Sequence, residues 1–246
     1  MFPYKDDNPT LSTPVVTFLL IGLNVLVWIL VQGMGTEPRL SASVCELGFI
    51  PGEVLHRLAP GTLVSGSGQL DCVTGGGRSG ATLLTSMFLH GGWLHLIGNM
   101  WFMWVFGNNV EDSMGRVRFF MFYVVCGLIA ALTQALVNPN SAIPMVGASG
   151  AISGVMGAYI VLYPRVRVHM FIFLGFIFFR TAVPAYLMLG YWFLLQIIGT
   201  LPQLAREEGG GVAFWAHTGG FLAGIVLVNV FRNPRLVALR RAHALP

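Results

Sequence analysis

The chain of 246 residues is 55% hydrophobic and only 10% charged, whereas an ordinary soluble domain carries about 25% charged residues. Its net charge of +4 would suit a nucleic-acid partner, but the 14 lysines and arginines are scattered between apolar runs and form no basic stripe. Composition therefore excludes a water-soluble domain and a nucleic-acid binder. It predicts a single integral membrane domain, all-α and polytopic, over residues 1–246.

Six apolar stretches are long enough, or nearly so, to cross a bilayer, which takes about 20 helical residues. The first is too long for a cleavable signal and is expected to remain as an anchor. Residues 1–14 then form an N-terminal segment too short for a further cytosolic domain, and 232–246 form a tail. Residues 170–179 are apolar but too short to cross, so we expect an interfacial or re-entrant piece there. The six predicted spans are 15–33, 88–109, 117–137, 149–163, 181–201 and 212–231.

The basic residues predict the orientation, because cytoplasmic loops carry an excess of Lys and Arg. Six spans place both termini on one side. That side holds ten basic residues: Lys5, Arg116, Arg118, Arg165, Arg167, Arg180, Arg232, Arg235, Arg240 and Arg241. The other side holds four: Arg39, Arg57, Arg78 and Arg206. We therefore expect a plasma (inner) membrane protein with both termini cytoplasmic and the long loop of about 34–87 outside.

Three cysteines show no CxxC or Cys/His spacing, so no metal or redox site is predicted. Cys126 lies in an apolar run and is expected to pack there. Cys45 and Cys72 fall in the same long loop. They can form a disulfide if that loop faces an oxidising compartment, and they are also compatible with free thiols.

Polar residues in three spans point to one functional site, because such residues are costly in lipid. The second span carries His90, His95 and Asn99, the fourth opens on Ser149, and the sixth begins near His217. The height of each candidate in the membrane follows from the number of residues between it and the charged residue at the cytoplasmic end of its helix, at about 1.5 Å per residue. In all three spans the candidate lies roughly 22–24 Å above the cytoplasmic edge of the hydrocarbon core. Agreement between three spans predicts a shared constellation near the outer side.

Glycines accompany both candidate helices and are expected to let their backbones approach closely. Those on the helix of His217 follow it at three and seven residues and so share its face. The supporting glycines are Gly150, Gly220 and Gly224, while Gly147 belongs to the segment that places Ser149 in the first turn of its helix. Three further amides in the spans are interpreted as helix-packing groups: Asn24, Gln134 and Gln196.

A serine hydroxyl becomes a nucleophile when a neighbouring base takes its proton, and His217 is the histidine placed to do so for Ser149. No Asp or Glu lies at that depth, so a Ser/His dyad is predicted. His95, Asn99 and the backbone N–H of Ser149 in the first helical turn are expected to form the oxyanion hole. His90 is assigned to loop support. The chemistry requires no cofactor or metal, but hydrolysis requires a hydrated cavity open to the outside.

Other readings of these residues are open. Gly-x-Ser-Gly in a membrane helix is often a packing motif, and the soluble nucleophile elbow is not matched because Ala151 occupies its last position. Intramembrane histidines also serve as metal or haem ligands or as proton relays. A channel or transporter that binds metal or haem through His95 and His217 is therefore an alternative.

At these residues the chain resembles the rhomboid intramembrane serine proteases. The matching motifs are His90-x4-His95-x3-Asn99, Gly147-x-Ser149-Gly150 and Ala216-His217-x2-Gly220-x3-Gly224, with Glu111-Asp112-x2-Gly115-Arg116 after the second span. The resemblance covers about residues 85–231.

The resemblance implies a six-helix rhomboid-like bundle with Ser149 as nucleophile, His217 as general base, and His95 and Asn99 as oxyanion donors. It also implies that the partners are transmembrane protein substrates within the lipid bilayer, cut in or near their membrane segments without a cofactor. Substrates are expected to enter beside the fifth span, whose outer half holds 192–194. One departure is that Ala81-Thr82 stands where the family often has Trp-Arg, which puts the shape of the first loop in doubt. A catalytically silent rhomboid-like protein that binds membrane clients is the second class.

Overall fold

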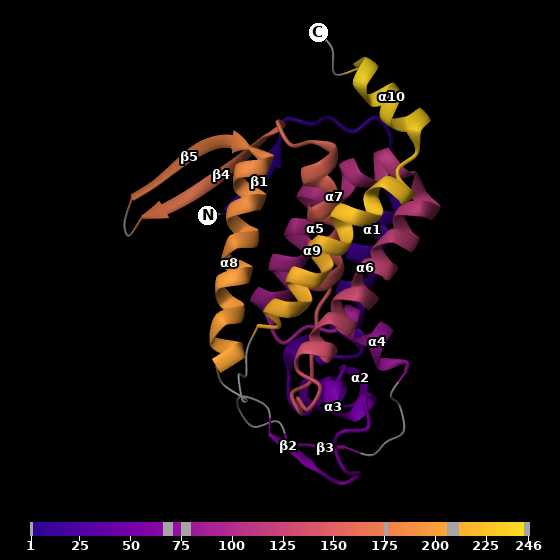
Figure 1. Ribbon diagram of the computed structural model, residues 1–246, viewed down its shortest axis with the longest axis vertical. Helices are drawn as coiled ribbons and strands as arrows, with labels where there is room; N and C mark the ends of the chain where they lie inside the picture. The colour runs from indigo at the N-terminus through magenta and orange to yellow at the C-terminus, as the bar shows by residue number, and fades with distance from the viewer. Residues whose placement is uncertain (1, 66–70, 75–79, 175–176, 206–211, 244–246) are drawn as a thin grey trace.

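A computed structural model describes residues 2–65, 71–74, 80–174, 177–205 and 212–243. Long helices form a bundle in this part of the chain and run alternately up and down (Figure 1). They are α1 (Val15–Leu30), α5 (Trp93–Met114), α6 (Arg116–Val137), α7 (Ser149–Leu162), α8 (Ala185–Ala205) and α9 (Phe214–Phe231). Each of the six predicted spans therefore overlaps one long helix.

Two of these helices, α6 and α9, are long and apolar enough to cross a membrane by length and composition alone. Three shorter apolar stretches accompany them, at Val15–Leu30, Ser149–Leu162 and Ala185–Leu201. The second predicted span begins later than expected, since α5 starts at Trp93 rather than at 88. A short 3₁₀ turn, η2 (Ser86–Phe88), and two glycines precede it. Glycine is a poor helix former, which explains the shift.

The segment between α1 and α5 is more ordered than a simple loop. It contains η1 (Gly33–Gly35), α2 (Arg39–Leu47), α3 (Pro51–Val54), β2 (Leu63–Ser65), β3 (Asp71–Val73) and α4 (Thr82–Thr85). Strands β2 and β3 pair antiparallel. A disulfide joins Cys45 of α2 to Cys72 of β3, with their Cα atoms 5.3 Å apart. Of the two alternatives for these cysteines, the structure has the disulfide, while Cys126 is a buried free thiol as expected.

The described residues of 170–179, predicted to be an interfacial or re-entrant piece, belong to a three-stranded sheet. Strands β4 (Arg167–Leu174) and β5 (Ile177–Pro184) form an antiparallel hairpin, and β1 (Phe2–Asp6) pairs with β4. The sheet lies beside the upper end of α8 (Figure 1). Aromatic and β-branched residues favour strands, and they fill this segment. The fold is thus mostly helical with two small sheets rather than purely α, and α8 begins at Ala185 instead of 181.

Both chain ends are tied to the bundle at the end opposite β2 and β3 (Figure 1). The predicted tail forms α10 (Pro234–His243), whose Arg240 is only 7% exposed. Arg240 contacts Asp112 of α5 at 2.5 Å, and it also donates to Asn8 and Asn109 at 2.7 Å each. The guanidinium also lies 5.0 Å from the ring centroid of Tyr163. The tail is therefore a docked helix.

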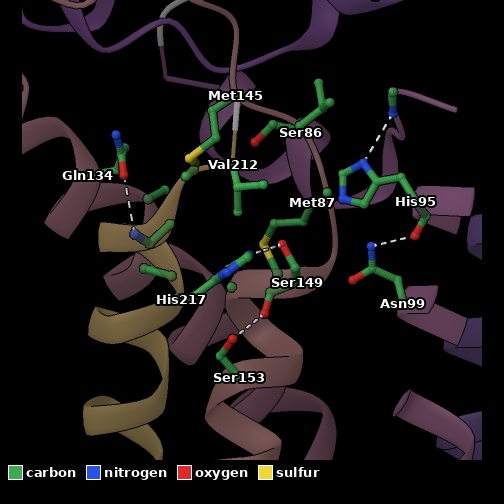
Figure 2. Close-up of a pocket in the computed structure, with 18 of the residues that line it drawn as sticks. Ser86, Met87, His95, Asn99, Gln134, Met145, Ser149, Ser153, Val212 and His217 are labelled. Atoms are coloured by element: carbon green, nitrogen blue, oxygen red, sulfur yellow. Dashed lines mark hydrogen bonds between the residues drawn. The ribbon is translucent and has the colours of Figure 1, made fainter. Parts of the chain in front are cut away.

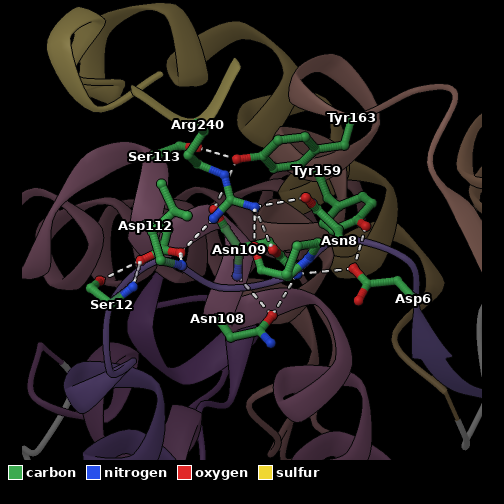
Figure 3. A network of polar contacts seen from close by, with 12 residues as sticks. Asp6, Asn8, Ser12, Asn108, Asn109, Asp112, Ser113, Tyr159, Tyr163 and Arg240 are labelled. Carbon is green, nitrogen blue, oxygen red and sulfur yellow. Dashed lines mark hydrogen bonds and ion pairs between the residues drawn. The ribbon is translucent and has the colours of Figure 1, made fainter. Parts of the chain in front are cut away.

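Further polar groups complete this cluster, which we call the terminal cluster (Figure 3). The Asp6 carboxylate of β1 accepts hydrogen bonds from Asn109 at 2.9 Å and from the Tyr159 hydroxyl of α7. Next to Asp112 in the chain, Glu111 accepts from the backbone N–H groups of Val16 and Thr17, at 3.0 and 2.8 Å. A carboxylate there satisfies free donors in the first turn of α1. The terminal cluster thus connects α5, α7, α10 and the N-terminal segment, and Glu111 fastens α1 beside it.

Candidate active site

Ser149 is the first residue of α7 and follows a backbone turn that only glycine adopts easily. Gly147 has φ +131° and donates its N–H to the Ser86 carbonyl at 2.9 Å. A Cβ at Gly147 would lie 2.9 Å from His95 Nε2, so a side chain there would be strained and would also crowd the site. The turn therefore delivers the Ser149 hydroxyl beside His95, at a helix start whose N–H groups have no intrahelical acceptor.

His217 lies in the first turn of α9 and faces Ser149 (Figure 2). Its Nε2 is 2.8 Å from Ser149 Oγ, which is hydrogen-bond distance for a hydroxyl and an imidazole. The two residues are 68 positions apart in the sequence, and they were predicted to lie at the same height in the membrane.

Glycines allow the two helices to come this close. A Cβ at Gly220 would lie 2.1 Å from the Gly150 carbonyl oxygen, and one at Gly224 would lie 2.0 Å from that of Gly154. Real Cβ atoms do not occur at such distances, so backbone of α7 rests directly on backbone of α9. We call this contact the glycine seam. Gly150, Gly220 and Gly224 thus have the packing geometry expected of them, with Gly150 itself against the Ala130 methyl of α6.

The other ring nitrogen of His217 has a partner that sequence reasoning missed. Nδ1 lies 2.8 Å from Oε1 of Gln196, a buried residue of α8. Gln196 had been interpreted as a packing amide together with Gln134, whose Oε1 accepts the backbone N–H of Ala216 at 3.3 Å. The sequence of an apolar run does not show which neighbour a single amide faces. Nothing in the sequence therefore distinguishes the role of Gln196 from that of Gln134.

His95 and Asn99 lie on one face of α5, across the cavity from His217 (Figure 2). Nδ1 of His95 accepts the Gly91 N–H at 3.3 Å, so in the neutral ring the proton is on Nε2, which lies 2.9 Å from where a Cβ at Gly147 would be. Asn99 donates one amide hydrogen to the His95 carbonyl at 2.8 Å and carries a second amide hydrogen. Both residues thus carry N–H donors, and both line the same cavity as Ser149.

His90 lies behind His95 and away from the hydroxyl. Its ring is fully buried and meets the His95 ring edge to face, with centroids 5.2 Å apart. Gln32 fixes the backbone of His90 by two hydrogen bonds of 2.8 Å each, one to its N–H and one to its carbonyl. This arrangement agrees with a supporting position rather than a reacting one.

A cavity of about 1220 Å³ adjoins the pair. Its walls come from α5, α6, α7, α8 and α9 and from the segment before α7, and they include Asn99, Ser149, Trp192 and His217. The volume exceeds the roughly 300–1,000 Å³ of small-molecule pockets and would admit an extended peptide segment together with water. Among the described residues, no group of three or more His, Cys, Asp or Glu side chains could hold a metal ion.

Comparison with known proteins identifies the family. Residues 78–234 match the Rhomboid domain, well over half of the chain. The chain belongs to the rhomboid family. The family and the apolar helices together indicate that this rhomboid is an integral membrane protein of a protease family.

Individual rhomboid relatives are similar over parts of their length. RHOMBOID-like protein 5 of Arabidopsis thaliana is 30% identical over 146 residues, which are 59% of this chain and 42% of the relative. Rhomboid protein 1, mitochondrial, of Saccharomyces cerevisiae is 29% identical over 173 residues, which are 64% and 42%. Rhomboid-like protease 5 of Toxoplasma gondii is 29% identical over 145 residues, which are 57% and 15%. The chain thus spans less than half the length of these relatives.

Proposed function

We propose that this rhomboid is an intramembrane serine endopeptidase that cleaves transmembrane or membrane-adjacent segments of other membrane proteins. The observation that carries the proposal is the hydrogen bond of 2.8 Å between Ser149 Oγ and His217 Nε2 at the wall of a large cavity. A serine held this way by an imidazole is the arrangement that nucleophilic catalysis needs. Family membership and a relative named a protease favour the same reaction.

The proposed chemistry uses only side chains and backbone of this chain. Ser149 Oγ attacks the carbonyl carbon of the scissile peptide bond while its proton passes to His217 Nε2. The negative charge that develops on the carbonyl oxygen is stabilised by His95 Nε2–H, the Asn99 amide and the Ser149 N–H. His217 then protonates the leaving amine. A water molecule in the cavity, deprotonated by His217, then attacks the carbonyl carbon of the acyl group on Ser149. His217 returns this proton to Ser149 Oγ as the bond between Oγ and the carbonyl carbon breaks, which releases the acid product.

The substrate class follows from where the site lies. The pair sits within a bundle of apolar helices, so the peptide must reach it from lipid or from the membrane surface. The middle of α8, with Trp192, Phe193 and Leu194, borders the cavity through Trp192, and this side of α8 is proposed as the entry side. Extended conformation is required, because only an unwound segment exposes its peptide carbonyl to a nucleophile.

We further propose that residues 1–246 form a single membrane domain with six spans, both termini in the cytoplasm and the site opening to the outer side of a plasma (inner) membrane. The bias of ten basic residues against four supports this orientation. Arg78 and Arg206, two of the four, lie outside the described residues. The disulfide in the segment between α1 and α5 supports an oxidising environment on that side. Accessibility of residues on each side to a membrane-impermeant reagent would test it.

The decisive experiment labels the detergent-purified protein with a serine-reactive fluorophosphonate and follows cleavage of a model transmembrane substrate. Ser149→Ala and His217→Ala are expected to lose both signals, with a fall in cleavage on the order of 10³-fold or more. Ser113→Ala and His169→Ala, which alter residues remote from the cavity, should keep them. Equal labelling and cleavage by wild type and Ser149→Ala would sink the proposal. A wild type that binds the substrate without cutting it would favour the client-binding class.

A further inference from the structure

We propose that Gln196 is a positioning residue that holds His217 in the tautomer able to accept the Ser149 proton. The inference rests on the proposed function and adds a third member, from a third helix, to the pair on α7 and α9.

The first observation is the chain of contacts through the imidazole. Gln196 Oε1 is 2.8 Å from His217 Nδ1, and His217 Nε2 is 2.8 Å from Ser149 Oγ. A neutral imidazole has one N–H donor and one bare nitrogen acceptor. If Nδ1 donates to the amide oxygen, Nε2 is bare and can accept from the hydroxyl. If Nε2 carried the proton instead, it could not act as a base toward Ser149.

The second observation fixes which way round the Gln196 amide lies. Its Nε2 donates to the Trp192 carbonyl of the preceding helical turn at 3.3 Å. Reversing the amide would set its oxygen against that carbonyl oxygen, two acceptors facing each other without a hydrogen. It would also point an NH₂ group at Nδ1 and drive the proton to Nε2. The Trp192 carbonyl therefore selects the amide orientation that leaves an acceptor for Nδ1.

The third observation is that the ring has no other orienting hydrogen bond in the described part of the chain. Among the described residues, the imidazole forms hydrogen bonds with Gln196 and Ser149 alone, and neither partner is a carboxylate. The Trp192 ring lies alongside at 6.0 Å between centroids, which restricts the ring plane but does not choose a tautomer. An amide oxygen thus takes the place that an Asp occupies in a serine triad. Being neutral, it avoids burying a charge in lipid.

In the proposed step the amide takes no proton. The Ser149 hydroxyl proton moves to Nε2 as Oγ bonds to the carbonyl carbon, and Nδ1–H keeps donating to Gln196 throughout. The doubly protonated ring is stabilised by this bond until Nε2 returns its proton to the leaving amine. Gln196 acts through His217 and touches neither substrate nor reacting atom.

The test compares three variants of the full chain. Gln196→Met removes the acceptor at similar length, and Gln196→Glu restores an acceptor. Thr200→Val is the matched control, because Thr200 lies one turn further along α8, is 3% exposed, and donates its hydroxyl hydrogen to the Ile197 carbonyl of its own helix. Two readouts are used: the rate of fluorophosphonate labelling, and the tautomer of His217 from nitrogen-15 chemical shifts, assigned by loss of the signal in His217→Ala.

We expect Gln196→Met to label about 10- to 100-fold more slowly, within the range that general base catalysis contributes. Its His217 should gain the Nε2–H tautomer, while Gln196→Glu recovers most of the rate and Thr200→Val resembles wild type. Wild-type labelling in Gln196→Met, an unchanged tautomer, or an equal slowing in Thr200→Val would each overturn the inference. Should wild type label no better than Ser149→Ala, the proposed function fails by itself, and the tautomer measurement still decides the role of Gln196.

Discussion

Two buried polar clusters lie at opposite ends of the bundle and are built in opposite ways. The terminal cluster contains full charges, with Arg240 against Asp112 at 2.5 Å, and its members are joined by several hydrogen bonds each. Within the described part of the chain, no carboxylate or guanidinium is bonded to Ser149 or His217. Their site rests on two bonds of 2.8 Å and borders a cavity of about 1220 Å³.

This difference shows how buried polar residues that hold an apolar chain together can be distinguished from those that form a functional site. Buried charge is tolerated where every partner is present, as around Arg240, and such a cluster mainly holds elements together. A site that must bind a substrate and react with it needs hydrogen-bond donors without a partner and an adjoining cavity for the substrate. His95 and Asn99, which both carry N–H donors, line the cavity in this way. Intramembrane polar residues therefore point to function only when their bonding is incomplete and a cavity adjoins them.

The largest effect on stability is expected from the terminal cluster. Arg240→Met leaves Asp112 buried without its cation, and should lower the free energy of unfolding by about 3–5 kcal/mol. Titration with a denaturing detergent measures it, with Arg235→Met on the exposed side of α10 as control. Fluorophosphonate labelling per folded molecule should stay at the wild-type rate. If labelling fell in proportion to stability, the two clusters would not be separate in function.

A smaller effect is expected from the pH. Burial raises the pKa of Asp6 from 3.8 to about 6. The folded state then binds this proton more tightly than the unfolded state. Protonated Asp6 therefore contributes fully to the free energy of unfolding below about pH 4, and this contribution is lost as pH rises toward 6. The pKa difference corresponds to at most about 3 kcal/mol.

Asp6→Asn provides the comparison, because the amide keeps an oxygen acceptor for Asn109 and Tyr159 but does not titrate. Wild type should lose stability relative to this variant between pH 4 and 7, measured by the same detergent titration. Parallel curves for the two proteins would contradict the raised pKa.

The smallest change in stability should come from the site itself. Ser149→Ala removes one hydrogen bond at a cavity wall, where the freed imidazole can bond to water, so we expect a change of less than about 1 kcal/mol. The same substitution is the one that should abolish labelling. A loss of several kcal/mol would show that the site is as structural as the terminal cluster.

Parts of this arrangement could be predicted from the sequence. The starts of α7 and α9 and the meeting of Ser149 with His217 follow from helix rise and charged ends, which are local counts. Residue contacts that depend on rotation about a helix could not be counted. Gln196 is one such case, because the sequence of an apolar helix is the same whether an amide in its middle faces lipid, a packed neighbour or a functional site.

Other parts were missed for a different reason. Arg240 reads as a solvated charge in a tail, since its partner Asp112 is 128 residues away. The hairpin of β4 and β5 was not predicted, because an unbroken apolar run shows neither the two-residue alternation of a half-buried strand nor the helical period. Its pairing with β1 joins segments more than 160 residues apart, which no local pattern reveals.

The glycine seam has a mechanical consequence. Backbone resting on backbone leaves α7 and α9 no side chains that could rotate to let them slide or part, so the two helices should move as one rigid body. Changes in the width of the cavity must then occur at its other walls, which come from α5, α6, α8 and the segment before α7. Two of these walls, α5 and α8, carry the donors His95 and Asn99 and the orienting Gln196, so thermal motion should disturb those residues first. The distance between nucleophile and base should be the last to change.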